Sequence, residues 1–462
     1  MRMIKRSGLV LAILVTSGCT TILQGNDSKP FEEAMVSHDY LTAATHAQEL
    51  ADMDPETGEV DDLFWTLQAG AALRFDGQYK LSTSYFDAAE KVMREEDTEN
   101  GLEKGAETVG SIAGNDAMLD YEQTYYDGVM ANTYKAWNFL ADGDMQNARV
   151  EFNRAEERQR IAAEYFADKI KEQKKELEEE AGESFSLVNS TLKSDLTQSA
   201  LKNAGFEENQ WKAYGGFVNP YTTYSNALFL MLNAKSKSDY QKAADLFNRV
   251  YKMTKSAAVK ADYDLARSLA RGKSKKALDK KVWVVFENGQ SIVREERRVD
   301  LPIGIIPGAD VQYAGIALPK LKSRGEAYPY ITVNGVKTAS LSNMDRIIGA
   351  EFDTEFPYIL AREVTRTTLK TIVQKQLNDE NELLGLAAGI LQAATTGADL
   401  RSFSALPCEF ETASLVAKSN QVTVKAGAFE MPVELDKSSK NHVIYVKAPT
   451  ANAAPTIQVI NL

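Results

Sequence analysis

The sequence predicts an α+β protein in which an all-α N-terminal domain is followed by a mixed, strand-rich domain with two helices. From Phe31 to about Gly272 the apolar residues recur with helical periodicity. From Lys281 onward the pattern changes to β-branched runs such as Val-Trp-Val-Val-Phe at 282–286. The basic stretch that begins at Lys273 lies at the change of pattern. We therefore expect a helical domain over 31–275 and a strand-rich domain over 281–462, a division that a chain of 462 residues allows.

The N-terminus has the order of a bacterial lipoprotein signal. Basic residues come first, an apolar run covers 9–15, and small residues precede Cys19. Residues 1–18 are thus predicted to be a signal peptide, Cys19 the lipidated (palmitate-bearing) residue, and 19–30 a polar tether. The apolar run is too short to span a bilayer. An ordinary signal peptide with a chance cysteine is the alternative, because Thr16 occupies a position where Leu is usual.

Thr20, directly after the cysteine, resembles the residue that sorts lipoproteins to the outer membrane. The expected location is therefore lipid-anchored at the outer membrane, facing the periplasm. The chain carries a net charge of −12, and loss of the basic signal peptide makes it more negative. Such a chain is a poor candidate for binding nucleic acid or anionic lipid headgroups.

The sequence lacks the usual signatures of an enzyme or metalloprotein. Cys19 and Cys408 are the two cysteines, so an acylated Cys19 leaves Cys408 as a buried thiol without an intramolecular disulfide partner. The three histidines have no metal-ligand spacing, and nucleophile-elbow, phosphate-loop and dinucleotide motifs are absent. We expect no enzyme activity, no metal and no cofactor.

The helical half contains three similar stretches, which begin at Gly77, Gly143 and Ser238. In each, a small residue, a Phe and a second small or branched residue follow at offsets of five, nine and twelve. This pattern resembles the tetratricopeptide repeat, in which small residues let paired helices approach closely. A weaker copy near Asp39 and a closing helix at 261–269 are also expected. Chance occurrence in ordinary helical hairpins is the alternative.

The C-terminal half is expected to alternate strands with two helices. The Asn-Gly pair at 288–289 predicts a hairpin after the first strand. Helices are expected at 356–378 and 380–395, and the second holds Gly385 and Gly389 in a G-x-x-x-G spacing. The expected strands are 282–287, 291–299, 311–317, 329–333, 410–417, 421–425, 431–435, 442–447 and 456–461.

An acidic group at Glu351, Asp353 and Glu355 alternates along the chain. In a strand, the three carboxylates would share one face, and a solvated strand edge is the default interpretation. The alternatives are a calcium site, because calcium takes oxygen ligands, or a general acid and base pair.

Two further segments resemble a family of bacterial lipoproteins of unknown function, with N-terminal helical repeats and a C-terminal α+β domain. One segment is Tyr121-Glu-Gln-Thr together with 135–144 and 148–155, and the other is Ala398-Asp-Leu-Arg-Ser-Phe-Ser-Ala-Leu-Pro. The resemblance implies an architecture and no established activity. In the second segment, Asp399 and Arg401 are expected to form a structural anchor, with a ligand-binding arginine as the alternative.

These observations predict a membrane-anchored periplasmic lipoprotein that acts as a protein-binding scaffold or assembly factor. Stacked helix pairs build concave surfaces. Tyr134, Trp137 and Tyr224 are the candidate groove contacts, and burial inside the repeats is the favoured alternative for all three. The expected partners are unidentified envelope proteins and the membrane, reached through Cys19, and a homo-oligomer is left open. The alternatives are an envelope enzyme acting on glycan or peptide through Glu351 and Asp353, and a self-assembling surface or ring component using the 385–389 helix.

Overall fold

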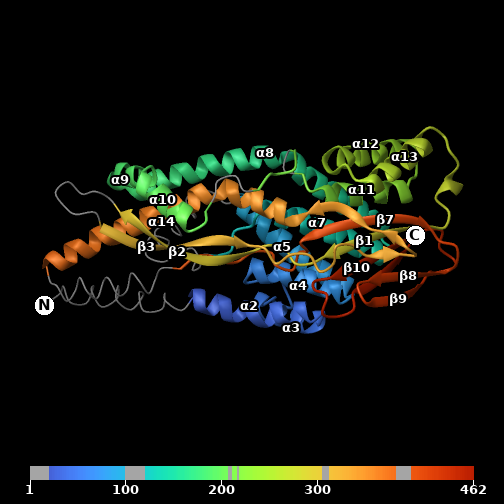
Figure 1. Cartoon of the computed structure of the whole chain (residues 1–462), viewed down its shortest axis with the longest axis horizontal. Coiled ribbons are helices and arrows are strands. Elements are labelled where there is room, and N and C mark those ends of the chain that lie inside the picture. The colour runs from blue at the N-terminus through green and yellow to red at the C-terminus, as the bar shows by residue number, and fades with distance from the viewer. Residues whose placement is uncertain (1–19, 99–119, 207–210, 216–217, 304–311, 381–396) are drawn as a thin grey trace.

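The computed structural model describes residues 20–98, 120–206, 211–215, 218–303, 312–380 and 397–462 (Figure 1). It confirms the α+β class, with helices in the first part of the chain and strands in the second. The expected signal peptide, Cys19 and the helix with Gly385 and Gly389 lie outside the described residues. Within the described ranges, no helix combines the length and apolar character needed to cross a bilayer.

The first part of the chain, where it is described, is built mainly from helices. Residues 20–30, which were expected to be a polar tether, belong instead to the first helix. The helices are α2 (Thr20–Val36), α3 (Tyr40–Ala51), α4 (Leu63–Phe75), α5 (Tyr79–Thr98), α7 (Tyr125–Ala141), α8 (Met145–Ala181), η3 (Gly182–Ser184), α9 (Phe185–Leu192), α10 (Asp195–Asn203), α11 (Pro220–Leu232), α12 (Lys237–Thr254), α13 (Ala257–Ala270) and η5 (Lys275–Ala277).

The three expected helix pairs form as α4–α5, α7–α8 and α11–α12. Every small–aromatic–small position predicted from the offsets is buried, including Phe86, Phe152 and Phe247 at 0 % exposure. In the first pair the Ser82 hydroxyl donates to the Gly70 carbonyl at 2.6 Å. A Cβ at Gly70 would come within 2.8 Å of the Phe86 ring. Small residues therefore set how closely the paired helices approach.

The sequence also explains where the helices begin. Asp62 accepts from the backbone N–H of Trp65 before α4, and Asp144 accepts from Gln146 and Asn147 before α8. Such acceptors satisfy N–H groups that lack a partner within the helix. The turns before α5 and α8 contain Gly77 and Gly143 with φ of 84° and 79°. Ser238, the residue matched to these glycines in the third pair, lies within α12, so this turn differs.

The second part of the chain forms two sheets, a two-stranded ribbon and one long helix. The five-stranded sheet has the order β11-β10-β1-β7-β6, the smaller sheet has the order β5-β4-β8-β9, and β2 pairs with β3. The elements are β1 (Lys281–Asn288), β2 (Val293–Ile303), β3 (Gln312–Lys322), β4 (Thr332–Val333), β5 (Val336–Lys337), β6 (Ala339–Asn343), α14 (Met344–Glu380), β7 (Glu409–Val416), β8 (Gln421–Ala426), β9 (Phe429–Glu434), β10 (His442–Ala448) and β11 (Thr456–Asn461).

The predicted hairpin at Asn288-Gly289 is wrong. β1 pairs in parallel with β10 and antiparallel with β7, whereas β2 pairs with β3. The Asn288 side chain donates to the Tyr328 carbonyl at 2.6 Å and to Glu411 at 2.7 Å, and it accepts from the backbone of 327 and 328. The Asn288 side chain therefore connects the end of β1 to residues 327–328 and to Glu411. It does not form a two-residue hairpin turn between β1 and β2.

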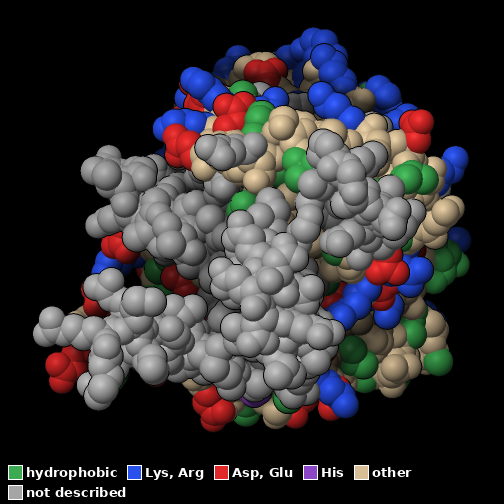
Figure 2. Space-filling view, turned by 90° about the vertical axis from the view of Figure 1, so that its left-hand side faces the viewer, with side chains coloured by type: hydrophobic (Ala, Val, Ile, Leu, Met, Phe, Trp, Pro, Cys, Tyr) green, Lys and Arg blue, Asp and Glu red, His purple; other side chains and the backbone are tan. Residues whose placement is uncertain are grey.

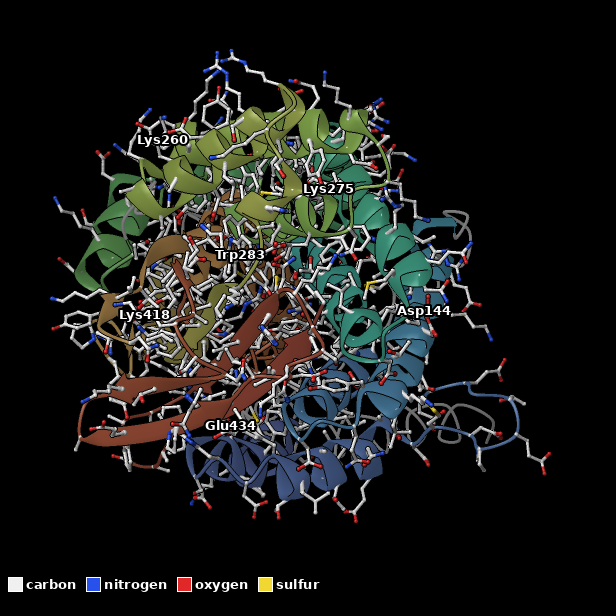
Figure 3. All side chains as sticks on the ribbon, turned by 90° about the vertical axis from the view of Figure 1, so that its right-hand side faces the viewer. Asp144, Lys260, Lys275, Trp283, Lys418 and Glu434 are labelled. Carbon is white, nitrogen blue, oxygen red and sulfur yellow. The ribbon has the colours of Figure 1, made fainter. Side chains whose placement is uncertain are left out.

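Alternation along the strands places the five-stranded sheet between two hydrophobic layers. On β1, Trp283 and Val285 pack into the cluster that includes the helices, whereas Val282, Val284 and Phe286 pack against the smaller sheet. The end-on view in Figure 3 shows the helices curving around the sheet. The helical repeats and the five-stranded sheet therefore share one hydrophobic core.

A second body of the molecule, here called the arm, extends away from this core at the left of Figure 1. It contains the C-terminal half of α8, η3, α9, α10, the β2–β3 ribbon and the C-terminal half of α14. Both α8 and α14 have 37 residues, which is about 55 Å at 1.5 Å per residue. The arm has its own hydrophobic cluster, whose fully buried members include Val188, Leu301, Ile316, Leu318 and Val364.

Replacing Gly70 by Ala tests the close approach of α4 and α5. Alanine favours a helix over glycine by about 1 kcal/mol, but its Cβ must displace the Phe86 ring. We expect Gly70→Ala to lower the free energy of unfolding by about 1–3 kcal/mol, measured by denaturant titration. The control is Gly128→Ala, where the atoms nearest to the Cβ belong to the end of the Arg158 side chain and not to a packed aromatic ring. Equal losses in both variants would contradict the account.

Candidate functional site

The three aromatic residues predicted to line a groove lie in the interior. Tyr134, Trp137 and Tyr224 are exposed by 0 %, 1 % and 0 %. The Trp137 ring packs edge-on against Tyr445 of the sheet with 5.5 Å between centroids, and its indole N–H donates to Ser225 at 3.2 Å. The prediction of an exposed groove at these residues is wrong, because the five-stranded sheet occupies the inner face of the helical repeats.

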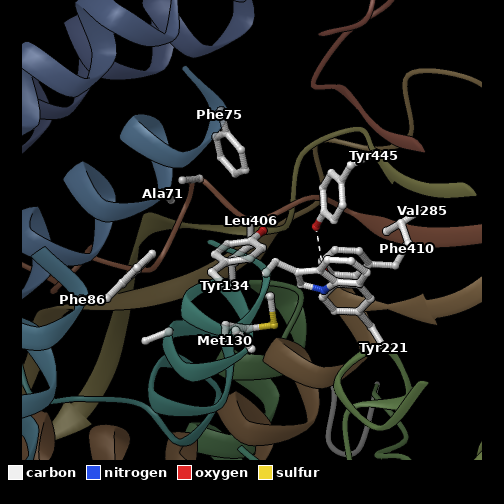
Figure 4. Packing of buried hydrophobic residues seen from close by; sticks show 14 of the residues in the cluster. Ala71, Phe75, Phe86, Met130, Tyr134, Tyr221, Val285, Leu406, Phe410 and Tyr445 are labelled. Carbon is white, nitrogen blue, oxygen red and sulfur yellow. Dashed lines mark hydrogen bonds between the residues drawn. The ribbon is translucent and has the colours of Figure 1, made fainter. Parts of the chain in front are cut away.

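A fully buried carboxylate, Glu287 on β1, lies at the interface between helices and sheet. Three tyrosines of its network, Tyr134, Tyr221 and Tyr445, are labelled in Figure 4. The Glu287 carboxylate accepts from the hydroxyl of Tyr445, from Lys447 Nζ at 3.0 Å and from the Tyr134 hydroxyl at 3.2 Å. The hydroxyls of Tyr445 and Tyr221 are 2.6 Å apart. The network thus connects β1 and β10 to α7 and α11.

A second cation, Arg74 of α4, lies beside this network. Its guanidinium is 4.7 Å from the Tyr445 ring centroid and 5.4 Å from that of Tyr134, and it donates to Asn138 at 2.8 Å. Burial lowers the pKa of Lys447, and the nearby Glu287 carboxylate opposes that shift. Glu287 therefore forms an ion pair with Lys447, whereas Arg74 is held by Asn138 and by the two tyrosine rings that border the same network.

Asp262 of α13 makes a parallel connection further along the sheet. It accepts from the Tyr224 hydroxyl at 2.8 Å and from the Trp283 indole N–H at 3.0 Å. Burial raises the pKa of the Asp262 carboxyl, although these hydrogen bonds oppose the shift. Tyr224, expected in a groove, therefore joins α11 to α13 and β1.

The acidic group at 351–355 lies on α14 and not on a strand. The expected helix at 356–378 begins earlier, at Met344, and residues two apart on a helix do not share a face. Glu351 accepts from the backbone N–H groups of Tyr125 and Tyr126 at 2.5 and 3.3 Å. Asp353 instead accepts from the backbone N–H of Trp211 at 2.9 Å. The predicted acid and base pair does not form.

Glu351 and Glu355 together hold the arm helix α14 against the rest of the protein. Glu355 pairs with Lys169 of α8 at 2.8 Å and with Arg294 of β2 at 3.7 Å. Burial raises the pKa of Glu351 to about 8, and the Glu355 charge adds to the rise. Burial alone would also raise the pKa of Glu355, but Lys169 and Arg294 bring it below its ordinary value.

A small hollow, with room for about one water molecule, adjoins this junction. It is lined by Glu351 and by mainly apolar surfaces of Tyr125, Ala213, Tyr214, Val218, Ile347 and Ala350. Each carboxylate of the acidic group is bound to a different partner, which does not suit a shared calcium ion. Throughout the described ranges, no three His, Cys, Asp or Glu side chains are grouped as metal ligands. The geometry of this site fits a structural junction.

The two segments that resemble a lipoprotein family are brought into contact. Arg401 and Asp399 form a bidentate pair, with Nε–Oδ1 and Nη2–Oδ2 distances of 2.9 and 3.1 Å. The Arg401 guanidinium lies 5.6 Å from the Tyr121 ring centroid. Gln68 of α4 donates to the Ser402 carbonyl at 3.1 Å, and thereby fixes this part of the chain on the helical repeats.

No protein-family model, curated protein or solved structure matches this chain. The residues above are therefore assigned from geometry alone. Glu287, Lys447 and Arg74 were not predicted from the sequence. A signal for two of them exists: Glu287 and Lys447 each follow an apolar β-branched strand run, on the same face as Trp283 and Tyr445. A charge in such a position needs a buried partner.

The Glu287 network can be tested by Glu287→Gln, which leaves Lys447 and Arg74 without a buried negative charge. We expect the free energy of unfolding to fall by about 3–5 kcal/mol, as is usual when one partner of a buried pair is removed. Adding Lys447→Met should recover part of that loss, because it removes one uncompensated charge. Denaturant titration of the two variants measures both effects; a double variant that is less stable than Glu287→Gln would count against the network.

The junction at Glu351 predicts a dependence of stability on pH. Its folded-state pKa of about 8 lies above the ordinary value of 4.5, so the folded state retains the proton. The stabilisation of the folded state by the proton on Glu351 is complete below pH 4.5, and it is lost as the pH rises through 8. Relative to wild type, Glu351→Gln should therefore gain about 1 kcal/mol or more between pH 5 and 9.

Denaturant titrations at both pH values measure this change. The control is Glu178→Gln, an exposed position on α8, where we expect no pH-dependent difference from wild type. A constant difference between wild type and Glu351→Gln across the range would refute the assignment.

Proposed function

We propose that this protein is an outer-membrane lipoprotein, anchored through Cys19 and facing the periplasm, which acts as a protein-binding scaffold through its arm. The observation that carries the proposal is the division of roles within the fold. The inner face of the helical repeats is filled by the chain's own sheet, whereas the arm extends from the body with a separate core. The arm is therefore the better candidate for contact with a partner.

Several contacts fix α14, which runs from the body into the arm, to neighbouring elements. Glu351 bonds α14 to the start of α7, and Glu355 connects α14 to α8 and β2. The guanidinium of Arg346 also donates to the carbonyls of 212 and 213 and lies 3.9 Å from the Tyr214 ring centroid. A scaffold needs a fixed geometry between its binding element and its body, and these contacts supply it.

The helix that follows Cys19 is also fixed to the body. Glu32 of α2 pairs with Arg324, and the Asp27 carbonyl lies 2.7 Å from His46 Nε2. An acyl group on Cys19 would then be attached next to an ordered helix. Such an attachment restricts how the body and the arm can be oriented on the membrane.

The structure argues against the alternative of an envelope enzyme but does not bear on the alternative of a self-assembling component. An envelope enzyme was expected to use Glu351 and Asp353 as acid and base, and these residues have separate partners. A self-assembling component was expected to use the helix with Gly385 and Gly389, which lies outside the described residues. Self-assembly therefore stays as an outcome that the experiment must distinguish.

Site-specific photocrosslinking in cells tests the scaffold proposal. The photoreactive residue is placed at Leu196 on α10 of the arm, and the matched control is Leu41 on α3 of the body; both side chains are 54 % exposed. We expect a discrete crosslink to an envelope protein from position 196 and none from position 41. Cys19→Ala should abolish the crosslink, because the protein then loses its place at the membrane.

Crosslinks to the same partner from both positions would contradict a specific role for the arm. Crosslinks only between copies of this chain would favour the self-assembling component. A crosslink from position 196 that survives Cys19→Ala would refute the requirement for the anchor.

A further inference from the structure

Positive charge is concentrated at the end of the molecule opposite the arm. Residues 252–281 contain ten Lys or Arg and three Asp or Glu, in a chain whose net charge is −12. This segment forms the end of α12, α13, η5 and the start of β1. The net charge of the whole chain therefore hides a strongly basic region.

Two other loops add lysines to the same place. The backbone N–H of Lys280 donates to the Lys440 carbonyl at 2.9 Å, and that of Ala417, next to Lys418, donates to the Lys280 carbonyl at 2.8 Å. We call the resulting surface the basic end, and it consists of Arg271, Lys273, Lys276, Lys280, Lys418 and Lys440, all of which are exposed. Figure 3 views this end of the molecule directly and labels Lys418 of the basic end, together with Lys260 of α13 and Lys275 of η5, which are not among the six.

The charges of the basic end are not neutralised by the protein itself. Among the described residues, none of its six side chains has a carboxylate within ion-pair distance. The opposite end of the molecule differs, because basic and acidic side chains lie next to each other there (Figure 2). On α8 of the arm, for example, Lys175 pairs with Glu179 at 3.6 Å. Uncompensated like charges raise the local potential and attract anions.

The form of the basic end indicates what kind of anion it suits. Five of its six members are lysines, which act as hydrated point charges and lack the bidentate geometry of arginine. They project from three separate loops, and the large apolar side chain exposed beside them is Val416, at 60 %. Protein interfaces usually depend on buried aromatic or arginine anchors, whereas lysine clusters of this kind bind anionic lipid surfaces.

We propose that the basic end binds the surface of a membrane that contains anionic lipid, by electrostatic attraction and without insertion. This contact is independent of Cys19, and it lies at the far end of the long axis from the arm (Figure 1). The protein would then have two separate means of contacting lipid. The net negative charge of the chain would argue against such binding if the charges were spread evenly over the surface. They are not, because positive charge is concentrated at the basic end.

Vesicle co-sedimentation of the full chain tests the proposal. The chain carries Cys19→Ala, so that no acyl group contributes, and vesicles of pure phosphatidylcholine are compared with vesicles rich in phosphatidylglycerol. We expect binding to the anionic vesicles alone, and loss of that binding at about 0.5 M salt, where electrostatic attraction is screened. Binding to neutral vesicles as well would overturn an electrostatic contact.

Two triple variants with the same change in net charge locate the surface. Lys273→Gln, Lys276→Gln and Lys280→Gln together should weaken binding on the order of 100-fold, from about 1 kcal/mol for each lysine. Lys171→Gln, Lys174→Gln and Lys175→Gln together alter exposed lysines of α8 in the arm and should leave binding almost unchanged. Equal losses would mean that net charge and not the basic end determines binding.

A parallel assay separates a lipid surface from an acidic polypeptide. If soluble poly-L-glutamate binds the chain through the same lysines while anionic vesicles do not, the assignment to lipid is wrong. If vesicles bind and an equal concentration of charge on poly-L-glutamate does not displace the chain, the assignment to a lipid surface is supported. Because the acyl site is absent from these assays, their failure leaves the scaffold proposal to be decided by crosslinking.

Discussion

The arrangement of this protein depends on one buried carboxylate, Glu287, at the interface between its helices and its sheet. Glu287 is on the central strand β1 and binds Lys447 and Tyr445 of the neighbouring strand β10. It also binds Tyr134 of α7, and Arg74 of α4 lies against the same tyrosine rings. A buried charge must be compensated locally, so the register of the sheet against the helices is specified by these few atoms.

This interface determines which surfaces remain for function. The helix pairs resemble repeats that bind other proteins, but their inner face packs against the sheet of the same chain. Contact with other molecules is left to the outer surfaces, the arm and the basic end. These two differ in chemistry: the arm has its own apolar core and ion-paired helices, whereas the basic end presents lysines without carboxylate partners. In the roles proposed above, the arm would hold a protein partner while the basic end contacts a charged membrane surface.

Periodicity predicted most of the elements and few of their contacts. The offsets around Phe86, Phe152 and Phe247 located the three helix pairs, and the β-branched runs located β1, β7, β8, β10 and β11. The same patterns do not reveal what a buried face packs against, so Tyr134 and Trp137 were expected in a groove. Glu351, Asp353 and Glu355 lie on a helix, and each binds a different partner that is distant in sequence. The spacing of the three residues does not reveal those partners. Likewise, Asn288-Gly289 is typical of a hairpin unless its side chain is used elsewhere.

Native-state hydrogen exchange can show whether the helices and the sheet form one unit around Glu287. We predict that the slowest amides of α7, α11, β1 and β10 share a single opening free energy, equal to that of global unfolding. Amides confined to the arm should open at a lower free energy, because the arm has a separate core. If the α11–α12 pair opened well below the global value while β1 and β10 stayed protected, the helices and the sheet would be independent and the account would be wrong.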